Sequence, residues 1–203
     1  YDINIQAAEG NIEANGATLA SKPSTGGAIS LIAELDINLD SAEITSAGDD
    51  GVNIQSEAGS INAPNTTIKS TNKADTANVV IQATGPINLD GATVESESSA
   101  VPPSPALLIE STADGISAIS AKLTSTNSDK LLKIAAQGLI DLDEALVSSG
   151  GSININTSED ISIQLTSMTG KIESGELLFE STGSNRKLYV DNATLSGHSI
   201  KAY

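Results

Sequence analysis

The chain has 203 residues, of which 38% are hydrophobic but only 2% aromatic, so a wholly disordered chain is excluded and aliphatic side chains must fill the core. Its formal net charge is −16 with only 10 lysines and arginines, which leaves no basic stripe for binding nucleic acid or an anionic membrane. The sequence contains no cysteine, which excludes disulfides and thiolate metal sites.

Eight short segments, met in chain order, alternate apolar and polar residues. Their paired apolar positions are Ile3/Ile5, Ile29/Leu31, Val52/Ile54, Val79/Ile81, Leu107/Ile109, Leu132/Ile134, Ile153/Ile155 and Leu177/Phe179. Successive side chains of a strand point to opposite faces, so each segment predicts a strand with one buried face. Because no segment sustains a period of about 3.6 residues, we expect almost no helix.

A second motif follows each of these segments and has apolar residues at both ends, seven positions apart. Its eight occurrences are Ile12–Leu19, Ile37–Ile44, Ile61–Ile68, Ile87–Val94, Ile116–Leu123, Ile140–Val147, Ile161–Met168 and Leu188–Leu195. A small residue stands two places before each final apolar residue: Ala17, Ala42, Thr66, Ala92, Ala121, Ala145, Thr166 and Ala193. Because a small side chain fits a tight corner, the motif predicts two more strands joined by a bend.

Turn-forming residues mark this bend. They are Asn15-Gly16, Asp40-Ser41, Pro64-Asn65, Asp90-Gly91, Asp143-Glu144 and Asp191-Asn192, several of which tolerate a positive φ. An asparagine also recurs at one outward position on three successive repeats, as Asn38, Asn62 and Asn88. Stacked asparagines form amide ladders, so we expect this row to support the fold rather than to bind a ligand.

The repeats begin at residues 3, 29, 52, 79, 107, 132, 153 and 177. A step of about 25 residues is typical of solenoids, in which each repeat makes one circuit and buries its apolar face on its neighbours. The sequence therefore predicts an all-β fold, a right-handed single-stranded parallel β-helix (β-solenoid) of about eight rungs. Each rung has three short strands, which in the first rung are Ile3–Ala7, Gly10–Ala14 and Ala17–Ser21.

The domain organisation follows from the same repeat. Residues 1–203 contain no linker that would divide them, so they form one parallel β-helix domain. Neither end carries a capping helix or polar cover, which solenoids need for solubility. We therefore expect the chain to be a piece of a longer surface protein, or to stack end to end with neighbouring rungs.

Three phrases of the sequence resemble filamentous-haemagglutinin-type adhesins: Gly10–Leu19, Gly85–Val94 and Gly150–Asn156. The resemblance extends over nearly the whole chain, although shaft repeats of that family are usually shorter and more uniform and its secretion-domain signature is not evident. That family consists of bacterial exoproteins exported by two-partner secretion, with long β-helical shafts. The resemblance implies an extracellular location at the bacterial cell surface, a role in adhesion and virulence, and no catalytic residue.

Parallel β-helices also serve as polysaccharide lyases and glycoside hydrolases, so an enzyme or a non-catalytic carbohydrate-binding relative is the alternative. Glycoside hydrolysis needs two carboxylates at one cleft, for which Asp49-Asp50 and the pair Asp141 and Asp143 are the candidates. We interpret the first pair as a solvated turn and the second as outward-facing structural residues. The only histidine, His198, lies near the chain end and is interpreted as exposed. We expect no enzyme activity.

No cofactor or metal is expected. The turn acids Asp40, Asp90, Asp143 and Asp191 lie on alternate rungs, about 10 Å apart by the strand spacing, and cannot share one calcium ion. An ice-binding threonine ladder is also disfavoured, because charged residues such as Lys69 and Glu95 interrupt the outward row.

Recognition is assigned to the loops that vary in length between rungs, because binding residues are concentrated on loops held by a rigid scaffold. The first choice is loop 95–106, with Ser98, Val101 and Ser104 as ligand contacts. The second is loop 182–187, with Asn185, Arg186 and Lys187. The expected partner is a cell-surface receptor or a polysaccharide, without nucleic acid or membrane insertion.

Overall fold

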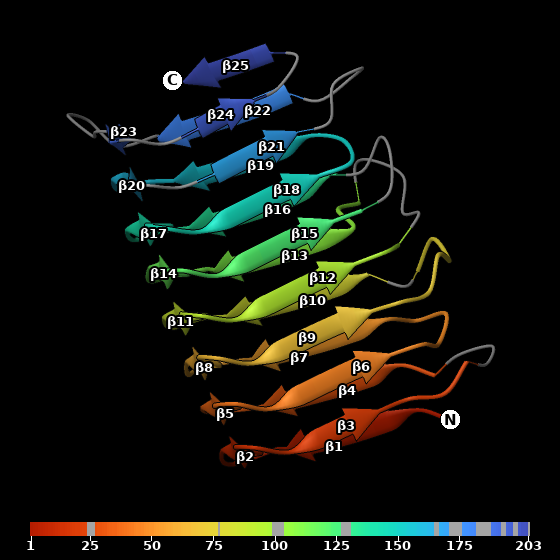
Figure 1. Cartoon of the computed structure of the whole chain (residues 1–203). Coiled ribbons are helices and arrows are strands. Elements are labelled where there is room, and N and C mark those ends of the chain that lie inside the picture. Colours follow the sequence, from red (N-terminus) through yellow and green to blue (C-terminus); the bar gives the residue numbers. More distant parts are fainter. Residues whose placement is uncertain are drawn as a thin grey trace.

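A computed structural model shows three parallel β-sheets wound into a solenoid, as predicted (Figure 1). The structure describes residues 1–23, 27–76, 78–98, 104–126, 131–164, 167–170, 176–181, 188–191, 194–196 and 199–202. Within these residues every regular element is a strand.

Sheet 1 contains the first strand of every rung. Its strands are β1 (Ile3–Ala7), β4 (Ile29–Ala33), β7 (Val52–Ser56), β10 (Val79–Ala83), β13 (Leu107–Ser111), β16 (Leu132–Ala136), β19 (Ile153–Thr157), β22 (Glu176–Ser181) and β25 (Ser199–Ala202). Sheet 2 is formed by β2 (Ile12–Glu13), β5 (Ile37–Asn38), β8 (Ile61–Asn62), β11 (Ile87–Asn88), β14 (Ile116–Ser117), β17 (Ile140–Asp141), β20 (Ile161–Gln164) and β23 (Leu188–Asp191). Sheet 3 is formed by β3 (Thr18–Ala20), β6 (Glu43–Ser46), β9 (Thr67–Ser70), β12 (Thr93–Ser96), β15 (Lys122–Ser125), β18 (Leu146–Ser149), β21 (Ser167–Gly170) and β24 (Thr194–Ser196).

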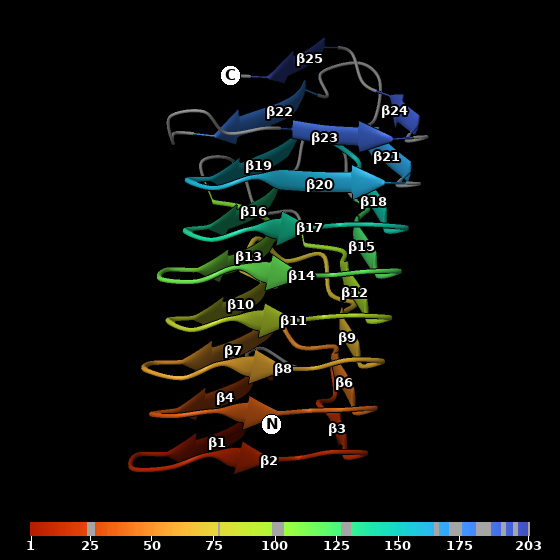
Figure 2. The same ribbon diagram turned by 90° about the vertical axis from the view of Figure 1, so that its left-hand side faces the viewer.

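Each strand pairs with the equivalent strand of the next rung, and the chain rises as a right-handed helix (Figure 2). In sheet 2, Ile12 pairs with Ile37 and Ile37 pairs with Ile61, so these isoleucines form one vertical file. The rung count differs slightly from the predicted eight, because β25 adds a ninth strand to sheet 1. The strands of the first rung in sheets 2 and 3 are shorter than predicted, since the flanking residues turn the corners.

The core consists of stacked aliphatic side chains that point inward from all three sheets. Leu31, Ile54, Ile81 and Ile109 in sheet 1 are all fully buried, as are Ile44, Ile68 and Val94 in sheet 3. β-branched side chains suit this arrangement because they have few rotamers to lose and nest on a pleated surface.

The inward residue that follows each sheet 2 strand alternates in size between neighbouring rungs, so it repeats every two rungs rather than every rung. The inward position after each sheet 2 strand holds leucine on one rung and alanine on the next, in the order Leu39, Ala63, Leu89, Ala118 and Leu142, all buried. Large side chains therefore lie over small ones, which lets layers separated by one strand spacing of about 4.8 Å interdigitate.

The bend between sheets 2 and 3 has the predicted backbone conformation. The same position of successive rungs has positive φ in Gly16, Ser41, Asn65, Gly91, Ser120 and Glu144, with values from 55° to 67°. The prediction that these bend residues tolerate a left-handed conformation is confirmed. Only glycine adopts this conformation without a steric cost, so the four other residues are strained there.

The corner between sheets 1 and 2 is crowded by contact between rungs. A Cβ added to Gly59 would lie 2.5 Å from the carbonyl carbon of Leu35 on the preceding rung. A Cβ added to Gly85 would in turn lie 2.9 Å from the carbonyl oxygen of Gly59, which accepts a 2.8 Å hydrogen bond from the Gly85 amide. These glycines are needed for close backbone approach and not for a special φ.

Candidate functional site

An open groove lies on the outer surface of sheet 2. It has a volume of about 600 Å³ and crosses five rungs, from β5 to β17. Its lining residues are Asn38, Ser60, Ile61, Asn62, Pro86, Ile87, Asn88, Asp90, Gly115, Ile116, Ser117, Leu139 and Asp141. We call this the sheet 2 groove. Its position follows from the local sequence, because the two-residue strands of sheet 2 direct one polar side chain per rung outward.

The outward row of amides forms part of the groove. The Nδ2 atom of Asn88 donates to Oδ1 of Asn62 at 3.2 Å, as expected for an amide ladder. Asn38 departs from the ladder, since its Nδ2 donates to Oε1 of Glu13 on the first rung at 2.7 Å. The row continues upward with Ser117 and Asp141 in the same register. The ladder prediction is thus confirmed for one pair, and the row as a whole presents amide, hydroxyl and carboxyl groups to solvent.

Two carboxylates line the groove, on rungs separated by one intervening rung. Oδ1 of Asp90 accepts hydrogen bonds from the Ser117 hydroxyl at 2.6 Å and from the Ile119 amide at 2.9 Å. Asp141 accepts the Asp143 amide at 3.1 Å. Burial is the largest cause that raises the pKa of Asp141, and the negative charges of Asp143 and Asp90 raise it further against the Asp143 amide bond. The groove therefore holds one carboxylate that bonds to the next rung and one that protonates more readily.

Asp36 lies beside the groove and shows the opposite perturbation. Its Oδ1 accepts both the backbone amide and the hydroxyl of Ser60 at 2.8 Å. These bonds favour the ionised carboxylate and lower the pKa of Asp36. The side chain supplies hydrogen bonds to a corner that lies outside the strand ladders, so its role is to join two rungs.

A metal centre is not formed by the residues described. No group of three or more histidine or acidic side chains comes close enough to hold an ion in that part of the chain. Of the turn acids on alternate rungs, Asp40 bonds within its own turn, where its Oδ1 accepts the Ser41 hydroxyl at 2.9 Å, whereas Asp90 bonds to the next rung.

The candidate loop residues fall partly outside the described structure. Val101, Asn185, Arg186 and Lys187 lie there, as does His198. Ser104 is exposed at a bend. Ser98 is fully buried, and its hydroxyl donates to Oδ1 of Asn78 at 2.7 Å and to the Ala74 carbonyl at 3.1 Å. The structure therefore argues against Ser98 as a ligand contact, because its side chain fastens the loop to the rung before.

The acidic pair Asp49-Asp50 occupies a turn, as interpreted from the sequence. Oδ1 of Asp49 accepts a hydrogen bond from the side-chain amide of Asn72 at 2.8 Å. The backbone carbonyl of Asp49 accepts one from the Thr76 hydroxyl at 2.6 Å. Asp49 thus links two successive loops.

Sequence reasoning assigned Asp90 to a turn and Asp141 to an outward-facing structural role, and so missed that both line one groove. The signal that would have found it is the outward column itself, which carries small or polar residues on every rung from Asn38 to Asp141. Each position in this column directly follows a buried isoleucine of sheet 2, so the column forms one continuous outer surface. Because the side chains in the column are short, this surface is hollow.

Comparisons of the chain with family models, with curated proteins and with solved structures find no match. Among the described residues, no helix is long and apolar enough to cross a membrane. The fold and the groove together define a class of protein, a right-handed parallel β-helix with an open groove along one sheet.

Proposed function

We propose that this chain is a structural and adhesive segment of a secreted or cell-surface bacterial protein, a stiff shaft that holds binding surface away from the cell. The continuous hydrogen-bond ladders of three sheets and one uninterrupted aliphatic core support this, since each rung is fixed to both neighbours. The resemblance to filamentous-haemagglutinin-type adhesins supports the extracellular location.

The observation that carries the adhesive part of the proposal is the chemistry of the sheet 2 groove. Amides, hydroxyls and carboxylates are the groups that hydrogen-bond to sugar hydroxyls, and the groove residues include all three. No cationic side chain lines the groove, whereas two carboxylates do, so the groove would repel a polyuronate. We therefore assign the groove to a neutral polysaccharide that extends across several rungs. The loops 95–106 and 182–187 remain candidate receptor contacts.

A binding experiment tests this assignment. Purified chain is passed over immobilised neutral polysaccharides, such as galactomannan and β-glucan, and over polygalacturonate. We expect retention on at least one neutral polymer and none on the polyuronate. Asn62→Ala should weaken retention, whereas Asn53→Ala, an outward asparagine of sheet 1, should not. Retention on polygalacturonate alone, or equal loss in both variants, would contradict the assignment.

The second candidate function is glycoside hydrolysis, and the raised pKa of Asp141, which lines the same groove as Asp90, favours it. A general acid needs such a shift, and a second carboxylate must face it across the scissile bond. The two residues are two rungs apart, roughly 10 Å along the axis, which is nearer to the inverting range of about 6.5–9.5 Å than to the retaining spacing of about 5–5.5 Å. Release of reducing ends from the same polymers, abolished in Asp141→Asn, would establish this activity.

End-to-end stacking is a further part of the proposal. Ile3, Ile5 and Leu19 of the first rung are only partly buried, whereas their partners on the second rung are fully buried. Strand edges with apolar side chains are templates for pairing with another rung. Light scattering across a range of concentrations tests this, and a mass that stays at one chain throughout would contradict it.

A further inference from the structure

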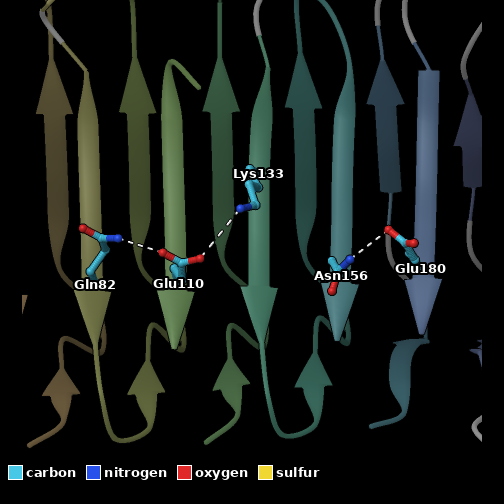
Figure 3. A network of polar contacts seen from close by, with 5 residues as sticks. All are labelled: Gln82, Glu110, Lys133, Asn156 and Glu180. Carbon is cyan, nitrogen blue, oxygen red and sulfur yellow. Dashed lines mark hydrogen bonds and ion pairs between the residues drawn. The ribbon is translucent and has the colours of Figure 1, made fainter. Parts of the chain in front are cut away.

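Polar side chains on the outer surface of sheet 1 bond from rung to rung. Nε2 of Gln82 donates to Oε2 of Glu110 at 2.7 Å, and the ammonium of Lys133 on the following rung lies 3.7 Å from Oε1 of the same carboxylate (Figure 3). Asn156 and Glu180 join two further rungs in the same way, with a hydrogen bond of 2.8 Å (Figure 3). Carboxylates on this surface therefore find their partners on a neighbouring rung.

Asp114 departs from this pattern, because its carboxylate turns back to the next residue of its own chain. It is an exposed residue in the corner between β13 and β14. Its Oδ1 atom accepts a hydrogen bond from the backbone amide of Gly115 at 2.7 Å. In the described part of the chain, the Gly115 amide donates to no carbonyl of another rung. A carboxyl group and the amide nitrogen that follows it thus meet at one exposed corner.

This contact resembles the starting point of a cyclisation. When an amide nitrogen attacks the carboxyl carbon of the preceding aspartate, a five-membered imide forms, and the new N–C bond takes the place of the N–H bond. The Gly115 N–H already points at the carboxyl group of Asp114, so it lies near the direction of the bond to be made. Reacting atoms held about 3–3.5 Å apart react faster, because little orientational entropy is left to lose. Glycine also has no Cβ that would crowd the attacking nitrogen.

We propose that Asp114 and Gly115 form a modification site, at which the aspartate converts through a succinimide to isoaspartate without an enzyme. The Gly115 nitrogen bonds to Cγ of the protonated carboxyl group and the C–OH bond breaks, so that the hydroxyl and the amide proton leave together as water. A water molecule then adds to either imide carbonyl, and the C–N bond at that carbonyl breaks. Opening at Cγ restores aspartate, whereas opening at the main-chain carbonyl gives isoaspartate. One water is released and one is consumed, so the net change is an isomerisation.

The chain contains two other Asp-Gly pairs, and neither brings the same two groups together. The Gly91 amide donates to the Ile119 carbonyl of the next rung at 2.8 Å, and Oδ1 of Asp90 accepts the Ile119 amide at 2.9 Å. The N–H therefore points at the next rung and away from the side chain that precedes it. At Asp50-Gly51, in the described structure, no hydrogen bond joins the Gly51 amide to the Asp50 carboxylate.

Isoaspartate at this corner would disturb two neighbouring rungs, because it adds one carbon atom to the main chain. The Asp114 carbonyl accepts the Gly138 amide at 2.9 Å, and the Gly115 carbonyl accepts the Ile87 amide at 3.1 Å. A Cβ at Gly115 would lie 2.5 Å from the Leu139 carbonyl oxygen, so the corner has no room for a longer chain. Since Gly115 lines the sheet 2 groove, the modification would also move one wall of that groove. The inference goes beyond the proposed function and does not depend on it.

Peptide mapping by mass spectrometry tests the proposal. The folded chain is incubated for several weeks at pH 7 and digested with endoproteinase Asp-N, which cleaves before aspartate and not before isoaspartate. We expect cleavage before Asp114 to be lost at least about tenfold faster than cleavage before Asp90. Equal rates of loss at the two residues would overturn the proposal, as would complete cleavage at Asp114 throughout.

Two asparagine variants provide a matched comparison, because asparagine closes the same ring with loss of ammonia. Asp114→Asn and Asp90→Asn place an identical Asn-Gly pair on adjacent rungs, and in both the side-chain carbonyl oxygen can still accept a hydrogen bond. We expect the folded Asp114→Asn chain to lose ammonia at this pair at least about tenfold faster than the folded Asp90→Asn chain. In guanidinium, where the fold is lost, the two rates should be similar. Similar rates in the folded chains would show that the contact with Gly115 does not promote the reaction, and the proposal would fail.

Discussion

Substitution of Gly59 by alanine should lower the free energy of unfolding only because the preceding rung lies directly against this glycine. A Cβ at Gly59 would lie 2.5 Å from the Leu35 carbonyl carbon, 2.6 Å from Oδ1 of Asp36 and 2.8 Å from the Asp36 amide nitrogen. Two of these three atoms belong to the backbone, so the corner must move by several tenths of an ångström. Overpacking of this kind costs about 1–3 kcal/mol, and we expect Gly59→Ala to lose about 2–3 kcal/mol of stability.

Gly10 provides a matched control, since it occupies the same corner position on the first rung. A Cβ there meets nothing within 4 Å, and its φ is not in the left-handed region. Gly10→Ala should therefore be neutral or stabilise by up to about 1 kcal/mol, because alanine restricts the unfolded chain. The two substitutions are chemically identical, so the difference between them measures contact between rungs.

Urea denaturation followed by far-ultraviolet circular dichroism measures both variants at pH 7. Because solenoids can unfold rung by rung, hydrogen exchange of the Ser60 amide, which Asp36 accepts at 2.8 Å, provides a local second readout. In Gly59→Ala that hydrogen bond should weaken and the pKa of Asp36 should rise toward its usual value. Equal midpoints for Gly59→Ala and Gly10→Ala would refute the stacking argument.

Three further predictions follow from single positions. Glu144→Gly should stabilise the fold by about 0.5–1 kcal/mol in thermal unfolding, because φ is 60° at this position and glycine adopts that angle without strain. A loss of stability would mean that the exposed hydrogen bond from Ser120 to Glu144 outweighs the backbone strain. Because the fold raises the pKa of Asp141, its ionised carboxylate lowers the stability of the folded state. This loss of stability is absent below the unfolded pKa of 3.8 and is complete once the pH has risen through the folded pKa. Asp141→Asn should therefore stabilise by about 0.5 kcal/mol at pH 7 and not at pH 3, and equal gains at both would contradict the burial argument. Ser111→Ala should lower the stability by about 1–2 kcal/mol in urea denaturation, because the buried hydroxyl donates to the Gly85 carbonyl at 2.8 Å and its removal leaves that acceptor unpaired. An unchanged midpoint would show that a water molecule replaces the hydroxyl.

Most of the fold could be predicted from the sequence, because its determinants are local. Alternation in pairs such as Ile29 and Leu31 defines a strand with one buried face, and recurrence about every 25 residues defines the circuit. Turn residues such as Asp90-Gly91 located the bend, and positive φ at Gly91 confirms it. The ninth strand, β25, was missed because Ala202 stands where every other first strand has a large apolar residue, so Ile200 alone does not define an alternating segment.

The sites depended on tertiary structure, because stacking makes neighbours of residues far apart in sequence. Asp90 and Asp141 lie 51 positions apart, yet both line one groove. Local patterns determine which side chains point outward, whereas register and corner geometry decide which of them meet. The strands and their order could therefore be inferred from the sequence alone, and the groove on sheet 2 could not.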